Sequence, residues 1–204
     1  VALAQPPHGV ERFTCRLAVV NAGAGAAPQV ADCRSVFPSL CGLERSSGCC
    51  TVTVGRAGAD VGTITEALAR LPEEGGEICV LPGEYVERVD LDGRHDISIH
   101  GCGGRTVVVG EGAGPVFSLD GARDIRISTI GIRNLEGPCV RLNRAERVSL
   151  VDLRMTAGDR SAVVGADVTD VSLLDSSIDL LPAEEPGKPQ RRPGVFLGGE
   201  ALRI

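Results

Sequence analysis

The chain has 204 residues and a formal net charge of −6, with 27 acidic and 21 basic side chains. The length fits one domain with a true core, and the charge argues against nucleic acid or an anionic membrane as a partner, because both require a basic face. Since no apolar run approaches the roughly 18 residues of a spanning helix, we expect no membrane span.

Residues 1–50 differ from the rest of the chain, because they contain stretches rich in Gly, Ala and Pro and follow no repeat. Fifty residues bury too little apolar surface to fold alone without staples or a metal. We therefore expect a loop-rich segment that packs on the outside or on the capped end of the following domain, residues 51–204.

Five of the eight cysteines lie in this segment: Cys15, Cys33, Cys41, Cys49 and Cys50. Their spacing does not match the paired two-residue spacings of common zinc modules, so three alternatives stay open: a zinc site, disulfides, or buried thiols. We expect the cysteines outside the segment, Cys79, Cys102 and Cys139, to be packing residues rather than ligands. If disulfides form, Cys79 is the most exposed partner, because alternation turns it outward.

The next stretch predicts a strand and then a short helix. Residues 51–54 alternate and are β-branched, as strands are. The helix spans about residues 63–71: Thr63 and Glu66 form a capping box, and Pro72 ends the pattern. We expect this helix to cover the first coil of a solenoid, whose open strand edges would otherwise meet water or other chains.

From Gly114 to Ile178 the sequence repeats with a step of 23 residues, and each repeat holds three short apolar–polar–apolar strands. Such small units must stack to share one interior, which predicts an all-β parallel β-helix of about five coils. One inward column should contain Val89, Phe117, Val140 and Val163, and another should contain Ile97, Ile125, Val148 and Val171.

The repeat should resume near the C-terminus, after an exposed loop at residues 181–192 with three prolines. Residues 195–197 and 202–204 look like the next coil, and Phe196 is expected, like Phe117, to fill the core. Because the chain begins at Val1 and ends at Ile204 within a predicted strand, we expect it to be a piece of a longer protein.

The predicted cap, the element Gly75-Gly76-Glu77-Ile78-Cys79-Val80-Leu81-Pro82-Gly83-Glu84-Tyr85 and the stacked strands together resemble the pectin-lyase-like superfamily over residues 51–204. This superfamily includes pectate lyases, polygalacturonases and phage tailspikes. The resemblance implies a right-handed, single-stranded parallel β-helix. Residues 1–50, with Asp32-Cys33-Arg34 and Cys49-Cys50-Thr51-Val52-Thr53-Val54-Gly55, are also similar to bacterial β-helix proteins without a known activity. The opening element belongs to the scaffold, so it implies no chemistry.

The catalytic motifs of the superfamily do not carry over to this chain. It has no Asp-Asp pair, and only Ile99-His100-Gly101 resembles the Gly-His-Gly motif of polygalacturonases. Pectate lyases hold calcium with acidic side chains on one sheet, whereas the matching outward positions here are Ser98, Arg126, Ser149 and Ser172. We therefore assign no catalytic residue.

Three aspartates and one tyrosine are candidate ligand-binding residues. Asp92 and Asp120 share a turn position on adjacent coils, and Asp90 points outward from the strand before. Calcium or a glycosidase reaction would use such an acid stack, but aspartates at repeated turns also cap backbone amides. Tyr85 is the only Tyr in a chain without Trp, so it is either a sugar platform or a scaffold residue.

We expect a non-catalytic structural or binding module of a larger bacterial surface, secreted or tail-like protein, without a cofactor. The alternative is a lyase or glycoside hydrolase that acts on acidic polysaccharide through Asp90, Asp92 and Asp120; calcium there and zinc at the cysteines are the open metal alternatives. The expected partners are the rest of a parent chain or another subunit at the C-terminal edge, and polysaccharide.

Overall fold

The computed structural model describes residues 18–21, 29–32, 50–56, 58–158, 161–181 and 193–198. The chain divides into two compact units, Val1–Leu43 and Glu44–Ile204. In the first, β1 (Ala18–Asn21) and β2 (Gln29–Asp32) pair as antiparallel strands. The expected packing of residues 1–50 on the following domain stays a prediction.

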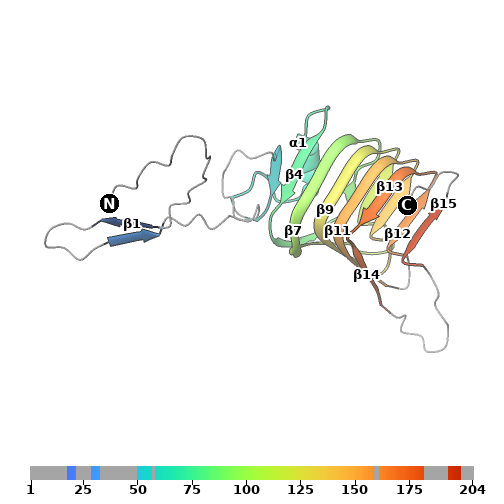
Figure 1. The fold of residues 1–204 in the computed structure, drawn as a ribbon. Coiled ribbons are helices and arrows are strands. Elements are labelled where there is room, and N and C mark those ends of the chain that lie inside the picture. Colours follow the sequence, from blue (N-terminus) through green and yellow to red (C-terminus); the bar gives the residue numbers. More distant parts are fainter. Residues whose placement is uncertain are drawn as a thin grey trace, which may run out of the picture. The chain divides into compact units, whose positions relative to one another are not determined.

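The second unit is a parallel β-solenoid of about five turns, as the 23-residue step predicts (Figure 1). Its smaller sheet has the strand order β15-β12-β10-β8-β6 and its larger sheet the order β13-β11-β9-β7-β4-β3. Strand β5 pairs with β7, and β14 pairs with β11. The bounds are β3 Val52–Val54, β4 Gly76–Val80, β5 Gly83–Val86, β6 Val89–Asp90, β7 His95–Val109, β8 Phe117–Asp120, β9 Arg123–Asn134, β10 Val140–Asn143, β11 Glu146–Ala157, β12 Val163–Ala166, β13 Thr169–Leu174, β14 Ser177–Leu180 and β15 Val195–Gly198.

Both predicted core columns are confirmed. In the smaller sheet the register joins Val89 to Phe117, Phe117 to Val140 and Val140 to Val163, and in the larger sheet it joins Ile97, Ile125, Val148 and Val171 in the same way. All eight side chains are at most 7% exposed. Like side chains therefore stack directly on each other from coil to coil, which is how such small repeats share one core.

The predicted cap is confirmed as α1 (Ile64–Arg70), which packs against the early strands β3, β4 and β6. The Thr63 side chain accepts a hydrogen bond from the Glu66 amide, and Ile64, Ala67 and Leu68 are buried. Glu87 also caps the N-terminus of α1, which the sequence did not predict. Its carboxylate accepts hydrogen bonds from the backbone amides of Ile64 and Thr65, each at 2.9 Å. Within the described residues, no helix is long and apolar enough to cross a membrane.

The C-terminal expectation is confirmed for one strand and wrong for one side chain. Strand β15 pairs in parallel with β12, as predicted for residues 195–197, whereas 182–192 of the predicted loop and the strand at 202–204 lie outside the described residues. Phe196 does not fill the core: it is 59% exposed. Phe196 is the second residue of β15 and pairs with Val164, the second residue of β12, and alternation turns this position away from the interior.

The register makes Val148 a sensitive position. We expect Val148→Asp to lower the free energy of unfolding by at least about 3 kcal/mol, because it places an unpaired charge between two buried neighbours. The matched control is Ser149→Asp, one residue along β11 on the outward face, and it should stay close to wild type. Denaturant unfolding checks both, and equal midpoints for Val148→Asp and wild type would contradict the register.

Candidate functional site

The structure brings the three predicted aspartates together on adjacent coils, at the ends of β6 and β8. Asp90 stands opposite Ser118 in the register. The Asp90 carboxylate accepts the Asp92 amide at 2.9 Å, and the Asp92 carboxylate in turn accepts the Asp120 amide at 2.7 Å and the Ser118 hydroxyl at 2.9 Å. The acid stack is therefore real, and its carboxylates bind neighbouring backbone and side-chain donors.

The third carboxylate of the stack pairs with an arginine from the next coil. Arg144 donates two hydrogen bonds to Asp120 Oδ1, at 2.6 and 3.0 Å. The Arg144 guanidinium and, to a lesser extent, the Asn143 side chain hold the pKa of Asp120 below its usual range. A glycosidase acid needs a raised pKa, because it must carry a proton at neutral pH. Asp120 is instead set up as a permanent hydrogen-bond acceptor.

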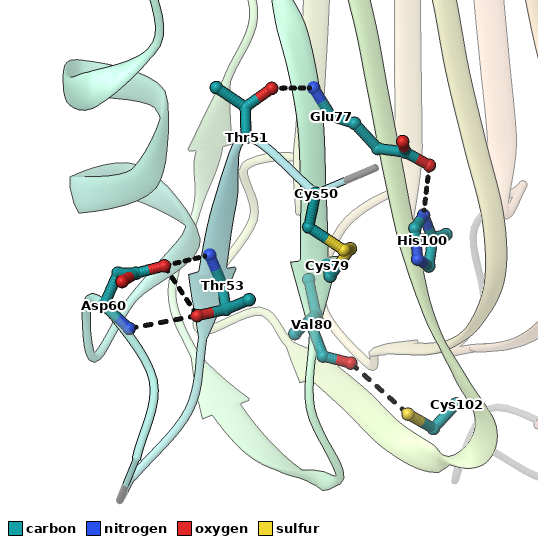
Figure 2. Close-up of a disulfide and its surroundings, with 9 residues drawn as sticks. All are labelled: Cys50, Thr51, Thr53, Asp60, Glu77, Cys79, Val80, His100 and Cys102. Atoms are coloured by element: carbon teal, nitrogen blue, oxygen red, sulfur yellow. Dashed lines mark hydrogen bonds and ion pairs between the residues drawn. A yellow bond between two sulfur atoms is a disulfide. The ribbon is translucent and has the colours of Figure 1, made fainter. Parts of the chain in front are cut away.

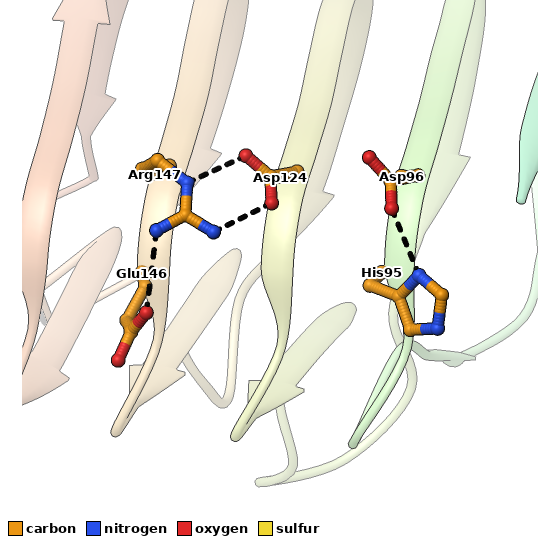
Figure 3. A network of polar contacts seen from close by, with 5 residues as sticks. All are labelled: His95, Asp96, Asp124, Glu146 and Arg147. Atoms are coloured by element: carbon orange, nitrogen blue, oxygen red, sulfur yellow. Dashed lines mark hydrogen bonds and ion pairs between the residues drawn. The ribbon is translucent and has the colours of Figure 1, made fainter. Parts of the chain in front are cut away.

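A second polar ladder lies where the strands of the larger sheet begin (Figure 3). Asp96, Asp124, Arg147 and Asp170 occupy one position on successive coils, and all four have φ between 51° and 56°. Aspartate tolerates this left-handed conformation, whereas Arg147 is held by a two-point ion pair with Asp124, with both N···O distances at 2.7 Å. These contacts lower the pKa of Asp124, so the ladder also links coil to coil.

Tyr85 lies inside the solenoid rather than on its surface. The side chain is only 6% exposed, and its hydroxyl donates a 2.8 Å hydrogen bond to the Leu81 carbonyl. Burial raises the pKa of Tyr85. The ring therefore fills the core beneath the turn between β4 and β5, which fits the scaffold alternative for this residue.

Of the five N-terminal cysteines, only Cys50 belongs to the described residues; Cys15, Cys33, Cys41 and Cys49 lie outside them. Cys50 forms a disulfide with Cys79 of β4, with a Cα–Cα distance of 5.7 Å (Figure 2). Cys79 is thus the partner that alternation predicts, but it is 7% exposed rather than open to solvent.

The other cysteines of the solenoid behave differently from one another. Cys102 is disulfide-bonded, so the expectation of a simple packing residue is wrong for Cys79 and Cys102 alike. Cys139 is free and buried, with its sulfur 3.6 Å from the Thr156 carbonyl oxygen. Burial raises the pKa of the Cys139 thiol to about 12, which confirms a packing role for this residue.

His100 is a neighbour of the disulfide that the sequence did not single out as a site residue. It stands next to Cys79 in the register of β4 and β7, and a His100 ring nitrogen lies within 4.8 Å of both sulfurs. Its Nδ1 contacts a Glu77 carboxylate oxygen at 3.1 Å. The signal was present in the sequence, because Ile78-Cys79-Val80 and Ile99-His100-Gly101 place Cys79 and His100 at equivalent outward positions of adjacent strands.

An open depression of about 530 Å³ on the outer face of the larger sheet lies beside two polar groups of residues: the Glu77–His100 pair and the second ladder. Glu77 connects it to His100, while Asp96 and Asp124 connect it to the second ladder. The whole lining is Thr51, Gly76, Glu77, Asp96, Ile97, Ser98, Asp124 and Arg126. Acidic, basic and hydroxyl groups therefore meet in this depression.

No protein family matches this chain, and neither does any curated protein or any solved structure. The class that the structure itself defines is a parallel β-solenoid of about five turns with one short helix near its N-terminal end. Membership of the pectin-lyase-like superfamily stays a prediction from the sequence.

The raised pKa and burial of Cys139 predict a thiol that is inert in the folded protein. The thiolate is the reactive form, so at pH 8 we expect iodoacetamide to leave Cys139 unmodified until denaturant unfolds the solenoid. Peptide mapping by mass spectrometry checks this. Rapid alkylation of Cys139 in native protein, without unfolding, would contradict its position in the core.

Proposed function

We propose that this chain is a rigid, non-catalytic β-solenoid module with a structural or binding role in a larger bacterial surface, secreted or tail-like protein. The observation that carries the proposal is the bonding of the acid stack. Asp92 accepts two hydrogen bonds from the next coil, and Asp120 accepts two from Arg144 one coil further. Side chains committed to joining coils are what a rigid spacer requires.

Other polar contacts support the same role, because they also run between coils. Arg147 spans from its own coil to Asp124 on the coil before, and the hydroxyls of Ser149 and Ser172 lie 3.2 Å apart on adjacent strands. Exposed pairs of this kind contribute little energy singly. Repeated on each coil, however, they fix the register of a stack whose core is already apolar.

The last coil supports a role within a longer solenoid. Counted over the described residues, β13, β14 and β15 each pair with one strand only. Three large apolar side chains on these strands are well exposed: Leu174 by 53%, Leu180 by 40% and Phe196 by 59%. Since apolar surface and open strand edges favour association, we propose that further coils of the parent chain cover this end.

The alternative function is a polysaccharide lyase or glycoside hydrolase. The convergence of Asp90, Asp92 and Asp120 on adjacent coils favours it, because calcium binding requires converging carboxylates and glycoside hydrolysis uses two carboxyl groups roughly 5 to 9.5 Å apart. The lowered pKa of Asp120 fits calcium-assisted chemistry better than general acid catalysis.

One comparison separates the two functions. The wild-type chain is incubated with acidic polysaccharides, with and without calcium, and absorbance of an unsaturated product and release of new reducing ends are followed. We expect neither signal. We also expect Asp120→Ala to lower the melting temperature, because Arg144 and the neighbouring turn lose their acceptor, whereas the control Glu73→Ala, an exposed residue after α1, should not.

The opposite pattern would overturn the module proposal. Cleavage by the wild-type chain that is lost in Asp92→Ala and Asp120→Ala, while both variants keep the wild-type melting temperature, would assign the acid stack to catalysis.

A further inference from the structure

Two cysteines and one histidine from consecutive chain segments converge on the outer face of the larger sheet (Figure 2). Cys50 lies just before β3, separated from it by Thr51, while Cys79 lies on β4 and His100 on β7. The two sulfurs and a His100 ring nitrogen lie within 4.8 Å of one another. Two thiolates and an imidazole are a ligand set that zinc prefers.

The surroundings of His100 orient it as metal-binding histidines are oriented. Its Nδ1 faces the Glu77 carboxylate at 3.1 Å, and such a carboxylate fixes the proton on one ring nitrogen and leaves the other nitrogen as a ligand. That second nitrogen, Nε2, is buried and has no hydrogen-bond partner among the described residues. A buried nitrogen without a partner is costly, and a bound metal ion would satisfy it.

Glu77 is itself held in place by the segment that carries Cys50. The Glu77 amide donates to the Thr51 hydroxyl at 3.0 Å, and the Thr51 amide donates to the Glu77 carbonyl at 2.7 Å. The same two hydrogen bonds between Thr51 and Glu77 therefore position both Cys50 and the carboxylate that contacts His100. The cluster is a built site rather than a chance meeting of side chains.

We propose that Cys50, Cys79 and His100 bind one zinc ion when the cysteines are reduced, and that the Cys50–Cys79 disulfide replaces this site when they are oxidised. With bonds of about 2.3 Å to sulfur and about 2.1 Å to nitrogen, ligand atoms of a tetrahedral zinc site lie roughly 3.5 Å apart. Opening the disulfide lets the two sulfurs separate to that distance.

The exchange between the two forms balances as follows. A dithiol reductant supplies two electrons and two protons to the S–S bond, and becomes a disulfide itself while Cys50 and Cys79 become thiols. Zinc binding then releases both thiol protons and leaves the oxidation state of zinc unchanged. Cys50 is only partly buried, whereas Cys79 is 7% exposed, so Cys50 is the more accessible residue of the two.

The test uses the full chain, reduced with a phosphine, and titrates Zn²⁺ against a chromophoric chelator. Because other cysteines contribute to total binding, the decisive quantity is the difference between two histidine variants on the same strand. His95→Gln is the control, since His95 lies outside the cluster and contacts Asp96. We expect wild type and His95→Gln to bind one more equivalent of zinc than His100→Gln.

Two further measurements distinguish coordination from a structural role of His100. Co²⁺ in place of zinc should give a thiolate-to-metal charge-transfer band in reduced wild type that is weakened in His100→Gln. Glu77→Gln should keep the stoichiometry but weaken zinc binding about 10- to 100-fold, because it removes the carboxylate that orients the ring. In the oxidised protein this equivalent of zinc should be absent from all variants.

Three results would overturn the proposal. Equal zinc stoichiometry in His100→Gln and His95→Gln would place the metal elsewhere. Equal binding by the oxidised and the reduced protein would remove the role of the two thiolates. Loss of the β-sheet circular dichroism signal on reduction, without recovery when zinc is added, would leave the disulfide as a structural staple only.

Discussion

Each coil of this solenoid buries its apolar side chains against the coils on either side, and the rest of the structure depends on this stacking. Val140 lies between Phe117 and Val163, and Val148 lies between Ile125 and Val171. Because side chains alternate along a strand, a shift of one residue would turn a whole column toward solvent. Additional residues are therefore tolerated only where a strand can bulge or a turn can lengthen.

Strand β7 shows how such an insertion is accommodated. Its pairing with β9 joins His100 to Ser128 and then, after two irregularities, Val107 to Gly131, so the step shortens from 28 residues to 24. The regular part of β7 ends at His100, beside the Cys50–Cys79 disulfide. The repeat thus departs from its step beside Cys50, Cys79 and His100. Such irregularities are expected at functional sites of an otherwise regular scaffold.

Polar side chains at the turns also join adjacent coils. Only some of these contacts could be predicted from the sequence. The 23-residue step and the alternation within each strand were visible in the sequence, so the two core columns, α1 and the convergence of Asp92 with Asp120 could be predicted. Their bonding partners could not. Arg144 reaches Asp120 from the next coil. Its backbone φ is 50°, a left-handed conformation that an arginine in the sequence does not predict.

The choice of Cys50 as the disulfide partner of Cys79 and the exposure of Phe196 could not be predicted from the sequence, for different reasons. Alternation indicated Cys79, but it left all five N-terminal cysteines as possible partners, and Cys50 lies before β3, outside the repeat. Phe196 is a large aromatic residue, and its size suggested burial, but as the second residue of β15 it takes an outward position opposite Val164. His100 required two weak signals to be combined: the equivalence with Cys79 across neighbouring strands and the carboxylate of Glu77.

The central claim is that adjacent coils pair residue by residue at the 23-residue step, and engineered cross-linking measures this most directly. The hydroxyls of Ser149 and Ser172 lie 3.2 Å apart, so the pair Ser149→Cys and Ser172→Cys should form a disulfide under mild oxidation, identified by peptide mapping. Arg126→Cys with Ser172→Cys is the control, because two strand spacings, about 9.6 Å, are too far to bridge. We predict cross-linking of the first pair alone; equal cross-linking of both pairs, or none of the first, would contradict the stacked register.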